Sequence, residues 1–176
     1  MTPVILPHEG TDPRIDPSAF VAPGAVLVGD VTVGPEASIW YGCVLRGDVA
    51  SITVGARANV QDGTIVHVSR KNGPTVIGAG SMIGHNAVLH ACTLEPGAFV
   101  GMSATVMDGA VIEGGAMVAA GAMVTPRKRI SAGELWAGAP AKLLRALSAE
   151  EAAYIPESVA NYVRLGQAHK RTAETA

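Results

Sequence analysis

Three of the five histidines in this 176-residue chain, His67, His85 and His90, lie within a segment of 24 residues. Imidazole is the commonest metal ligand in proteins, and a catalytic Zn²⁺ site commonly takes three protein ligands and leaves one position for water. The spacing alone does not show whether the three rings face one another. The elements that carry the histidines decide that question.

Those elements are indicated by a six-residue repeat. Aliphatic residues recur at every sixth position, with two register slips and one single-residue deletion. The series is Ile15, Val21, Leu27, Val33, Ile39, Leu45, Val54, Val60, Val66, Ile77, Ile83, Leu89, Leu94, Val100, Val106, Ile112, Val118 and Val124. Such hexapeptides form short parallel strands separated by tight turns, three to a coil, in a parallel β-helix. The repeats predict an all-β fold of about six coils, with the two slips as loops at corners.

The rest of the chain is predicted to complete a single domain. We expect a lead-in over residues 1–14, the β-helix over 15–130, and a connecting segment with a C-terminal α-helix over 131–176. Ser148 and Glu151 have the spacing of a capping box at the start of this helix. Pro156 is predicted to kink or split the helix, and the polar tail from about Gln167 is predicted to fray.

The composition and charge of the chain argue against some classes of binding partner. The net charge of −2 and a pI near 6.2 give no electrostatic case for binding nucleic acid or an anionic membrane. No segment approaches the ~20 apolar residues of a membrane span, and the first ten residues lack a signal-peptide pattern. Two cysteines make no disulfide framework, so we expect a cytoplasmic protein.

The repeat register assigns a direction to each histidine. The aliphatic residues that precede Arg46, His67 and His90 share one column of the coil, so these three side chains point outward from consecutive rungs. Rungs are about 4.8 Å apart, which lets His67 and His90 bind one ion. His85 projects from a different face and does not reach that ion within one chain. A homotrimer that packs one face of each coil against the adjacent face of the next would supply it.

Polar residues beside the histidines are the candidate supporting groups. Gln61 and Asp62 lie one rung below His85. Gln61 is suited to donate or accept a hydrogen bond at the site, and Asp62 is placed to pair with His85 across the trimer interface. Asp48 is either a turn residue or a member of the site, and the register leaves both readings open.

Over about residues 10–165 the chain resembles the gamma-class carbonic anhydrase-like family of left-handed β-helix proteins. The residues that carry the resemblance are Leu45-Arg-Gly-Asp48, Asn59-Val-Gln-Asp62, His67, Gly84-His85, His90 and Glu134-Leu-Trp-Ala-Gly-Ala-Pro-Ala-Lys142. The resemblance implies a left-handed coil and a homotrimer.

The same resemblance implies the site. It assigns the metal to His67 and His90 of one subunit and His85 of the next. It also places Gln61 near a metal-bound hydroxide. Arg46, Asp48 and Asp62 become interface and supporting groups.

The implied chemistry is attack of that hydroxide on CO₂ to give bicarbonate, because the metal lowers the pKa of its water towards 7. We expect Zn²⁺, with Fe²⁺ or Co²⁺ as alternatives. Arg46, held by Asp62, is expected to attract the product anion.

One departure concerns proton transfer. The archetype of the family carries glutamates beside its site, whereas here Val49 follows Asp48 and the loop at 68–74 contains no acid. We therefore expect slow turnover, or proton transfer through another group such as Tyr162. Two other readings remain open: a thioesterase or other acyl-CoA-related hydrolase on the same fold, and a non-catalytic metal-binding or assembly protein.

Overall fold

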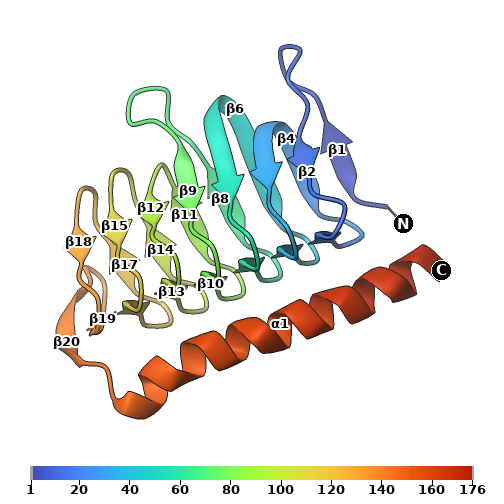
Figure 1. Ribbon diagram of the computed structural model, residues 1–176. Helices are drawn as coiled ribbons and strands as arrows, with labels where there is room; N and C mark the ends of the chain where they lie inside the picture. The colour runs from blue at the N-terminus through green and yellow to red at the C-terminus, as the bar shows by residue number, and fades with distance from the viewer. Residues whose placement is uncertain (1, 176) are drawn as a thin grey trace.

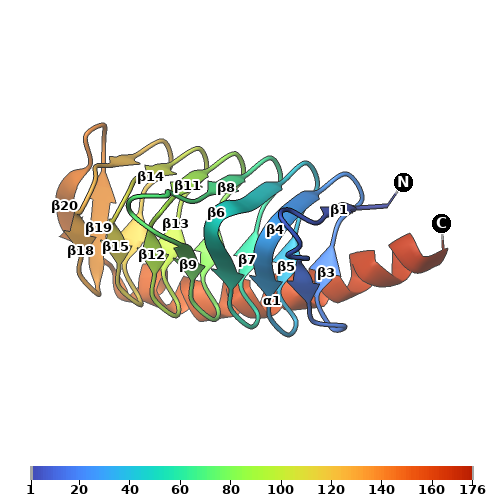
Figure 2. The same cartoon turned by 90° about the horizontal axis from the view of Figure 1, so that it is seen from above.

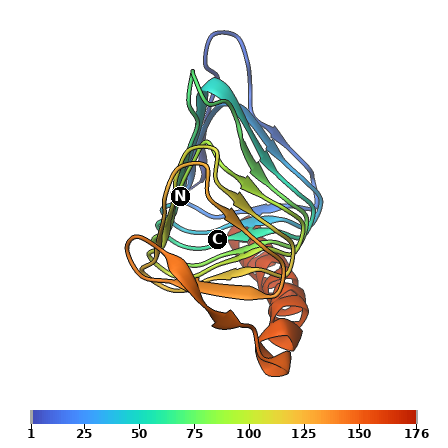
Figure 3. The same ribbon diagram turned by 90° about the vertical axis from the view of Figure 1, so that its left-hand side faces the viewer.

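Short parallel strands stack into three faces of a triangular left-handed β-helix, as the six-residue repeat predicts (Figures 1 and 3). The computed structural model describes residues 2–175. Seen from the end, the ribbons of the coil outline a triangle, and a single helix lies along its outside (Figure 3).

Each face carries one strand from each turn of the coil. The first face consists of β3 (Phe20–Val21), β5 (Ser38–Ile39), β7 (Asn59–Val60), β10 (Met82–Ile83), β13 (Phe99–Val100), β16 (Met117–Val118) and β19 (Glu134–Ala137), with β20 (Lys142–Ala146) antiparallel to β19. The second, here named the histidine face, consists of β1 (Val4–Leu6), β4 (Val26–Val33), β6 (Val44–Val54), β8 (Ile65–His67), β11 (Val88–His90), β14 (Thr105–Val106) and β17 (Met123–Val124). The third consists of β2 (Arg14–Ile15), β4, β6, β9 (Thr75–Ile77), β12 (Thr93–Leu94), β15 (Val111–Ile112) and β18 (Arg129–Ile130).

The coil therefore makes about seven turns, one more than the six that the aliphatic repeat predicts. The repeat does not end at Val124. Ile130 pairs with Ile112 and Trp136 pairs with Val118, which extends the ladder at its C-terminal end. At the other end Ile5 pairs with Leu27. The repeat did not predict the additional turn, because Trp136 occupies a position that is aliphatic elsewhere and β1 lies outside the six-residue spacing.

The two register slips have different structures. The first is not a loop: β6 continues through it as one strand of 11 residues that rounds the corner between the histidine face and the third face. The second is a loop over residues 68–74, closed by two backbone hydrogen bonds between Ser69 and Gly73. Only this second slip interrupts the strands, and it directly follows His67.

Inward aliphatic side chains fill the coil. Leu45, Val66 and Leu89 stack in register beneath the histidine face, and none of the three has any exposed surface. Full burial of each such side chain stabilises the fold by roughly 1.5–3 kcal/mol. The outward residues that follow them are consequently fixed by the same ladder.

Helix α1 (Ala149–Thr175) packs along the outside of the coil and contacts β3, β5 and β7 (Figures 1 and 2). Its start confirms the predicted capping box. The Ser148 backbone N–H donates to Glu151 Oε2 at 2.8 Å, and the Glu151 N–H donates to Ser148 Oγ at 3.2 Å. The helix begins at the last turns of the coil and ends beside the first ones.

The predicted split of this helix at Pro156 and the predicted fraying of its end are wrong. It runs unbroken through Pro156, because Ile155 and Val159, both nearly buried, hold the turns on either side against the coil. That packing outweighs the hydrogen bond that proline removes. The end is also ordered: Gln167 Nε2 donates to the Ser18 carbonyl at 2.8 Å, and the helix continues to Thr175. Within residues 2–175, no helix has both the length and the apolar character needed to cross a bilayer.

Candidate metal centre

His67 and His90 occupy the last positions of β8 and β11, and the parallel register pairs them directly. Their ring centres are 5.1 Å apart. The closest nitrogens, Nδ1 of His67 and Nε2 of His90, are 3.1 Å apart. Arg46 lies on the rung below, opposite His67, so the predicted column of three outward residues is present.

A carboxylate flanks each ring of the pair on the side away from the other ring. Asp48 Oδ1 lies 3.0 Å from Nε2 of His67, and Asp48 also forms an ion pair with Arg46. Asp108 Oδ1 lies 2.6 Å from Nδ1 of His90. The pair is thus the centre of a chain of polar contacts that runs along the histidine face.

Both carboxylates are held in their ionised form. Burial opposes ionisation of Asp48, but hydrogen bonds from His67 and Arg46 outweigh it and lower the pKa of this carboxyl. The pKa of Asp108 is lowered mainly by a hydrogen bond from Asn72, against burial, with a further contribution from His90. Both groups are therefore pure hydrogen-bond acceptors at neutral pH.

This fixes the tautomers of the two rings. Because an ionised carboxylate only accepts, Nε2 of His67 and Nδ1 of His90 must carry the hydrogens. In neutral rings the other two nitrogens then direct their electron pairs at each other across 3.1 Å. Such an arrangement calls for a cation between them, either a proton or a metal ion. Two nitrogens on a tetrahedral Zn²⁺ with bonds of about 2.0–2.1 Å would lie about 3.3 Å apart, so the pair fits a metal.

His85 lies apart from this pair, in the turn after β10. Its Nδ1 is 2.8 Å from Asp62 Oδ2 in the same chain, so the predicted partner is correct but is reached without a neighbour. Nearby, Gln61 Nε2 donates to Asn59 Oδ1 at 3.0 Å. The amide nitrogen of Asn59 is buried and has no hydrogen-bond partner.

An apolar cavity of about 370 Å³ opens beside His85. Gln61 and His85 are polar residues in its wall, and α1 contributes Glu151, Tyr154 and Tyr162. Burial raises the pKa of the Tyr162 phenol, and the nearby Tyr154 and Asp62 raise it further.

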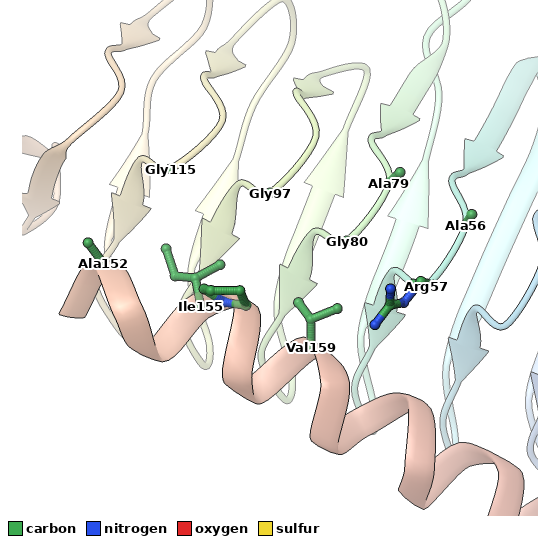
Figure 4. Close-up of a pocket in the computed structure, with 10 residues that line it drawn as sticks. Ala56, Arg57, Ala79, Gly80, Gly97, Gly115, Ala152, Ile155 and Val159 are labelled. Carbon is green, nitrogen blue, oxygen red and sulfur yellow. The ribbon is translucent and has the colours of Figure 1, made fainter. Parts of the chain in front are cut away.

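Another cavity, of about 530 Å³, lies between the first half of α1 and the turns of the coil, beside the contacts that hold the helix there (Figure 4). Ile155 and Val159 point into it from the helix, opposite the small residues Gly80 and Gly97. Its lining includes one charged residue, Arg57, and no histidine. We assign no chemistry to it.

The structure thus gathers the predicted site residues into two groups. Arg46 and Asp48 join the His67–His90 pair, so within one chain Arg46 contacts Asp48 and not Asp62. Gln61 and Asp62 accompany His85. Across residues 2–175, no cluster of three or more His, Cys, Asp or Glu is arranged to hold a metal ion by itself.

Asp108 and Asn72 were missed by the sequence analysis. Asp108 lies two residues after Val106, the next inward position above Leu89. Extending the histidine column by one rung would have brought attention to Asp108. No periodic signal marks Asn72, which lies in the irregular loop.

Known proteins resemble the chain closely, although no protein-family model matches it. It is 52% identical over 162 residues to gamma carbonic anhydrase 2, a mitochondrial protein of Arabidopsis thaliana, covering 89% of this chain but only 58% of that relative. It is 40% identical over 167 residues to a carbonic anhydrase of Geobacillus kaustophilus, covering 95% of this chain and 91% of the relative. The solved structure of a hexapeptide transferase family protein from Anaplasma phagocytophilum matches with a TM-score of 0.91 and 51% identity, over 94% of this chain and 97% of that one. The chain belongs to the gamma carbonic anhydrase family of left-handed β-helix proteins.

Proposed function

We propose that the protein is a metal-dependent carbonic anhydrase that interconverts CO₂ and bicarbonate, with Zn²⁺ or Fe²⁺ as its metal and Co²⁺ as a third candidate. One observation carries the proposal: Nδ1 of His67 and Nε2 of His90 face each other 3.1 Å apart, while Asp48 and Asp108 contact the other nitrogen of each ring. Membership of the gamma carbonic anhydrase family supports the reaction.

The third ligand in this proposal is His85 of a neighbouring subunit in a homotrimer. His85 is 40% exposed, and it projects from a face adjacent to the histidine face. Large apolar side chains flank both halves of the site: Ile65 and Val88 beside the pair, and Met102 one rung along from His85. All three are more than a third exposed in the single chain, and trimer packing would bury them.

When bound, the metal would make hydroxide available as a nucleophile near neutral pH. The chain's own residues would position the reactants. Asp48 accepts a hydrogen bond from Nε2–H of His67 and so orients that ring. Asp48 also holds Arg46 by an ion pair, and the Arg46 guanidinium attracts the bicarbonate anion. Gln61, fixed by Asn59, presents its amide at the cavity beside His85.

The deciding test is stopped-flow CO₂ hydration by protein loaded with zinc or with iron, compared with His90→Ala. We expect turnover in at least one metal form and loss of it in the variant, because one of the facing nitrogens is gone. His169→Ala is the matched control, since His169 bonds to Tyr41 and lies in neither histidine group. If neither metal form exceeds the His90→Ala background while metal is bound, a non-catalytic metal-binding role replaces the proposal.

A second candidate function is thioester hydrolysis. The apolar cavity of about 370 Å³ beside His85 is larger than CO₂ requires and suits an acyl chain. A relative of known structure is also described as a hexapeptide transferase family protein. Release of free thiol from acyl-CoA substrates of increasing chain length, measured on the same metal-loaded samples, separates the two functions. Hydrolysis of acyl-CoA without CO₂ hydration would favour a thioesterase function.

A further inference from the structure

The loop over residues 68–74 is tied to the next rungs of the histidine face by one side chain. Ser69 Oγ accepts a hydrogen bond from the Asn72 backbone at 3.2 Å, which shapes the loop. Asn72 Nδ2 then donates to Asp108 Oδ2 at 2.7 Å. Asp108 follows β14, the strand that pairs with β11, so the loop after His67 reaches past the rung of His90.

The two oxygens of Asp108 have separate donors. Oδ2 accepts from Asn72, and Oδ1 accepts from Nδ1 of His90 at 2.6 Å. Two contacts on different oxygens fix the plane of the carboxylate, so its acceptor is aimed at one ring nitrogen. A neutral imidazole can carry its hydrogen on either nitrogen. This contact selects the Nδ1–H form and leaves Nε2 of His90 as the electron-pair donor.

We propose that Asp108, held by Asn72, is a positioning residue that sets the tautomer of His90, and that the 68–74 loop thereby belongs to the metal centre. The metal-affinity part of the inference rests on the proposed function. The tautomer part concerns the metal-free chain and stands without it. Carboxylates that orient a metal-binding histidine typically contribute 10–100-fold to metal affinity or activity.

Asp108→Asn is the sharpest test because it keeps the size of the side chain. Asn72 would still donate to the amide oxygen, which turns the new NH₂ group towards Nδ1 of His90. That nitrogen would then have to accept, and the hydrogen would move to Nε2, the nitrogen needed for the metal. We expect zinc affinity to fall about 10–100-fold, measured by competition with a chromogenic chelator. Asn72→Ala leaves the carboxylate in place but untethered, so we expect a smaller loss.

Nitrogen-15 NMR of the imidazole rings in metal-free protein reads the tautomer directly. We expect Nδ1 of His90 to carry a hydrogen in the unmodified chain and to lack one in Asp108→Asn. Asp12→Asn is the matched control, because Asp12 is an exposed aspartate of the lead-in, and it should change neither measurement.

Two results would overturn the inference: an Nδ1 of His90 without a hydrogen in the unmodified chain, or zinc affinity and Nδ1 protonation both unchanged in Asp108→Asn. If Asp108→Asn fails to fold, the Asn72→Ala variant and the tautomer of the unmodified protein still decide it. If CO₂ hydration is absent while the tautomer and zinc affinity shift as expected, the carbonic anhydrase proposal fails and this one stands.

Discussion

The side chains of His67 and His90 are 22% and 35% exposed, and their aspartates, Asp48 and Asp108, are 18% and 22% exposed. His85 and Asp62 are 40% and 41% exposed. Each of these three histidines has a carboxylate partner, yet only His67 and His90 lie on a shared ladder. In the proposed shared centre, one half would therefore be assembled within each chain, and the other half would lie on the surface of a neighbour.

The largest expected effect is on zinc binding, when the His67–His90 pair and His85 are disrupted in different chains. His67→Ala and His85→Ala should each abolish zinc binding at the shared site, since each removes one ligand from every site. When the two variants are unfolded, mixed equally and refolded, about a quarter of the sites should return, because that fraction combines an intact pair with a neighbour's intact His85. Zinc per trimer is the measurement.

The control for this mixing experiment is His67→Ala with His90→Ala. Both damage the same half, so no chain in the mixture has an intact pair and no site should return. Recovery in this control, or none in the first mixture, would contradict a site divided between subunits.

A smaller effect is expected from loosening the ladder beneath the pair. Leu89→Ala removes a fully buried side chain directly under His90 and should cost about 2–5 kcal/mol in the free energy of unfolding. Leu94→Ala, equally buried on the third face, should cost a similar amount. Only Leu89→Ala should also weaken zinc binding. Urea unfolding and chelator competition on both variants check this, and equal zinc affinities would show that the ladder does not set the geometry of the pair.

Low pH should lower the stability of the fold around the His67–His90 pair, because Asp48 and Asp108 become protonated. Because the folded pKa values of Asp48 and Asp108 lie below the ordinary value of 3.8, both groups stabilise the fold at higher pH. That contribution is lost as pH falls through the lowered folded pKa values. Carbon-13 NMR titration of the aspartate carboxyls measures both midpoints directly. A midpoint at or above 3.8 for either group would contradict the stabilising hydrogen bonds assigned to that carboxylate.

The smallest effect is expected at Tyr162, which the sequence analysis offered as a proton acceptor. Burial and the neighbouring Tyr154 and Asp62 raise the pKa of its phenol, so it stays protonated at neutral pH and cannot accept a proton. We expect Tyr162→Phe to leave kcat for CO₂ hydration unchanged at low buffer concentration. A large fall that added imidazole buffer restores would reinstate Tyr162 in proton transfer.

The histidine column was predictable because a six-residue period fixes both depth and direction. Knowing that Val66 and Leu89 point inward is sufficient to place His67 and His90 outward on adjacent rungs. The same logic separated His85 from them. The positions of these three histidines follow from the backbone repeat and do not depend on the conformation of any loop.

What escaped prediction depends on contacts outside the repeat. Asn72 meets Asp108 because of the particular path of the 68–74 loop, which no periodicity encodes. The helix passes through Pro156 because Ile155 and Val159 are anchored on the coil, and the sequence does not state how strong that anchoring is. The capping box at Ser148 was predictable because both of its partners lie within four residues.

The direct pairing of β8 with β11 has a consequence for design. The distance between the two rings is set by one step of the ladder, and every step of a parallel coil is nearly the same. Met107 follows Val106 on the next rung, and Met102 occupies the rung above His85. Replacing both methionines by histidine and His67 by alanine would shift the proposed metal centre by one step, about 4.8 Å, along the molecular axis. Because the steps are nearly equal, a binding site designed on one rung can be moved to another rung with its spacing unchanged.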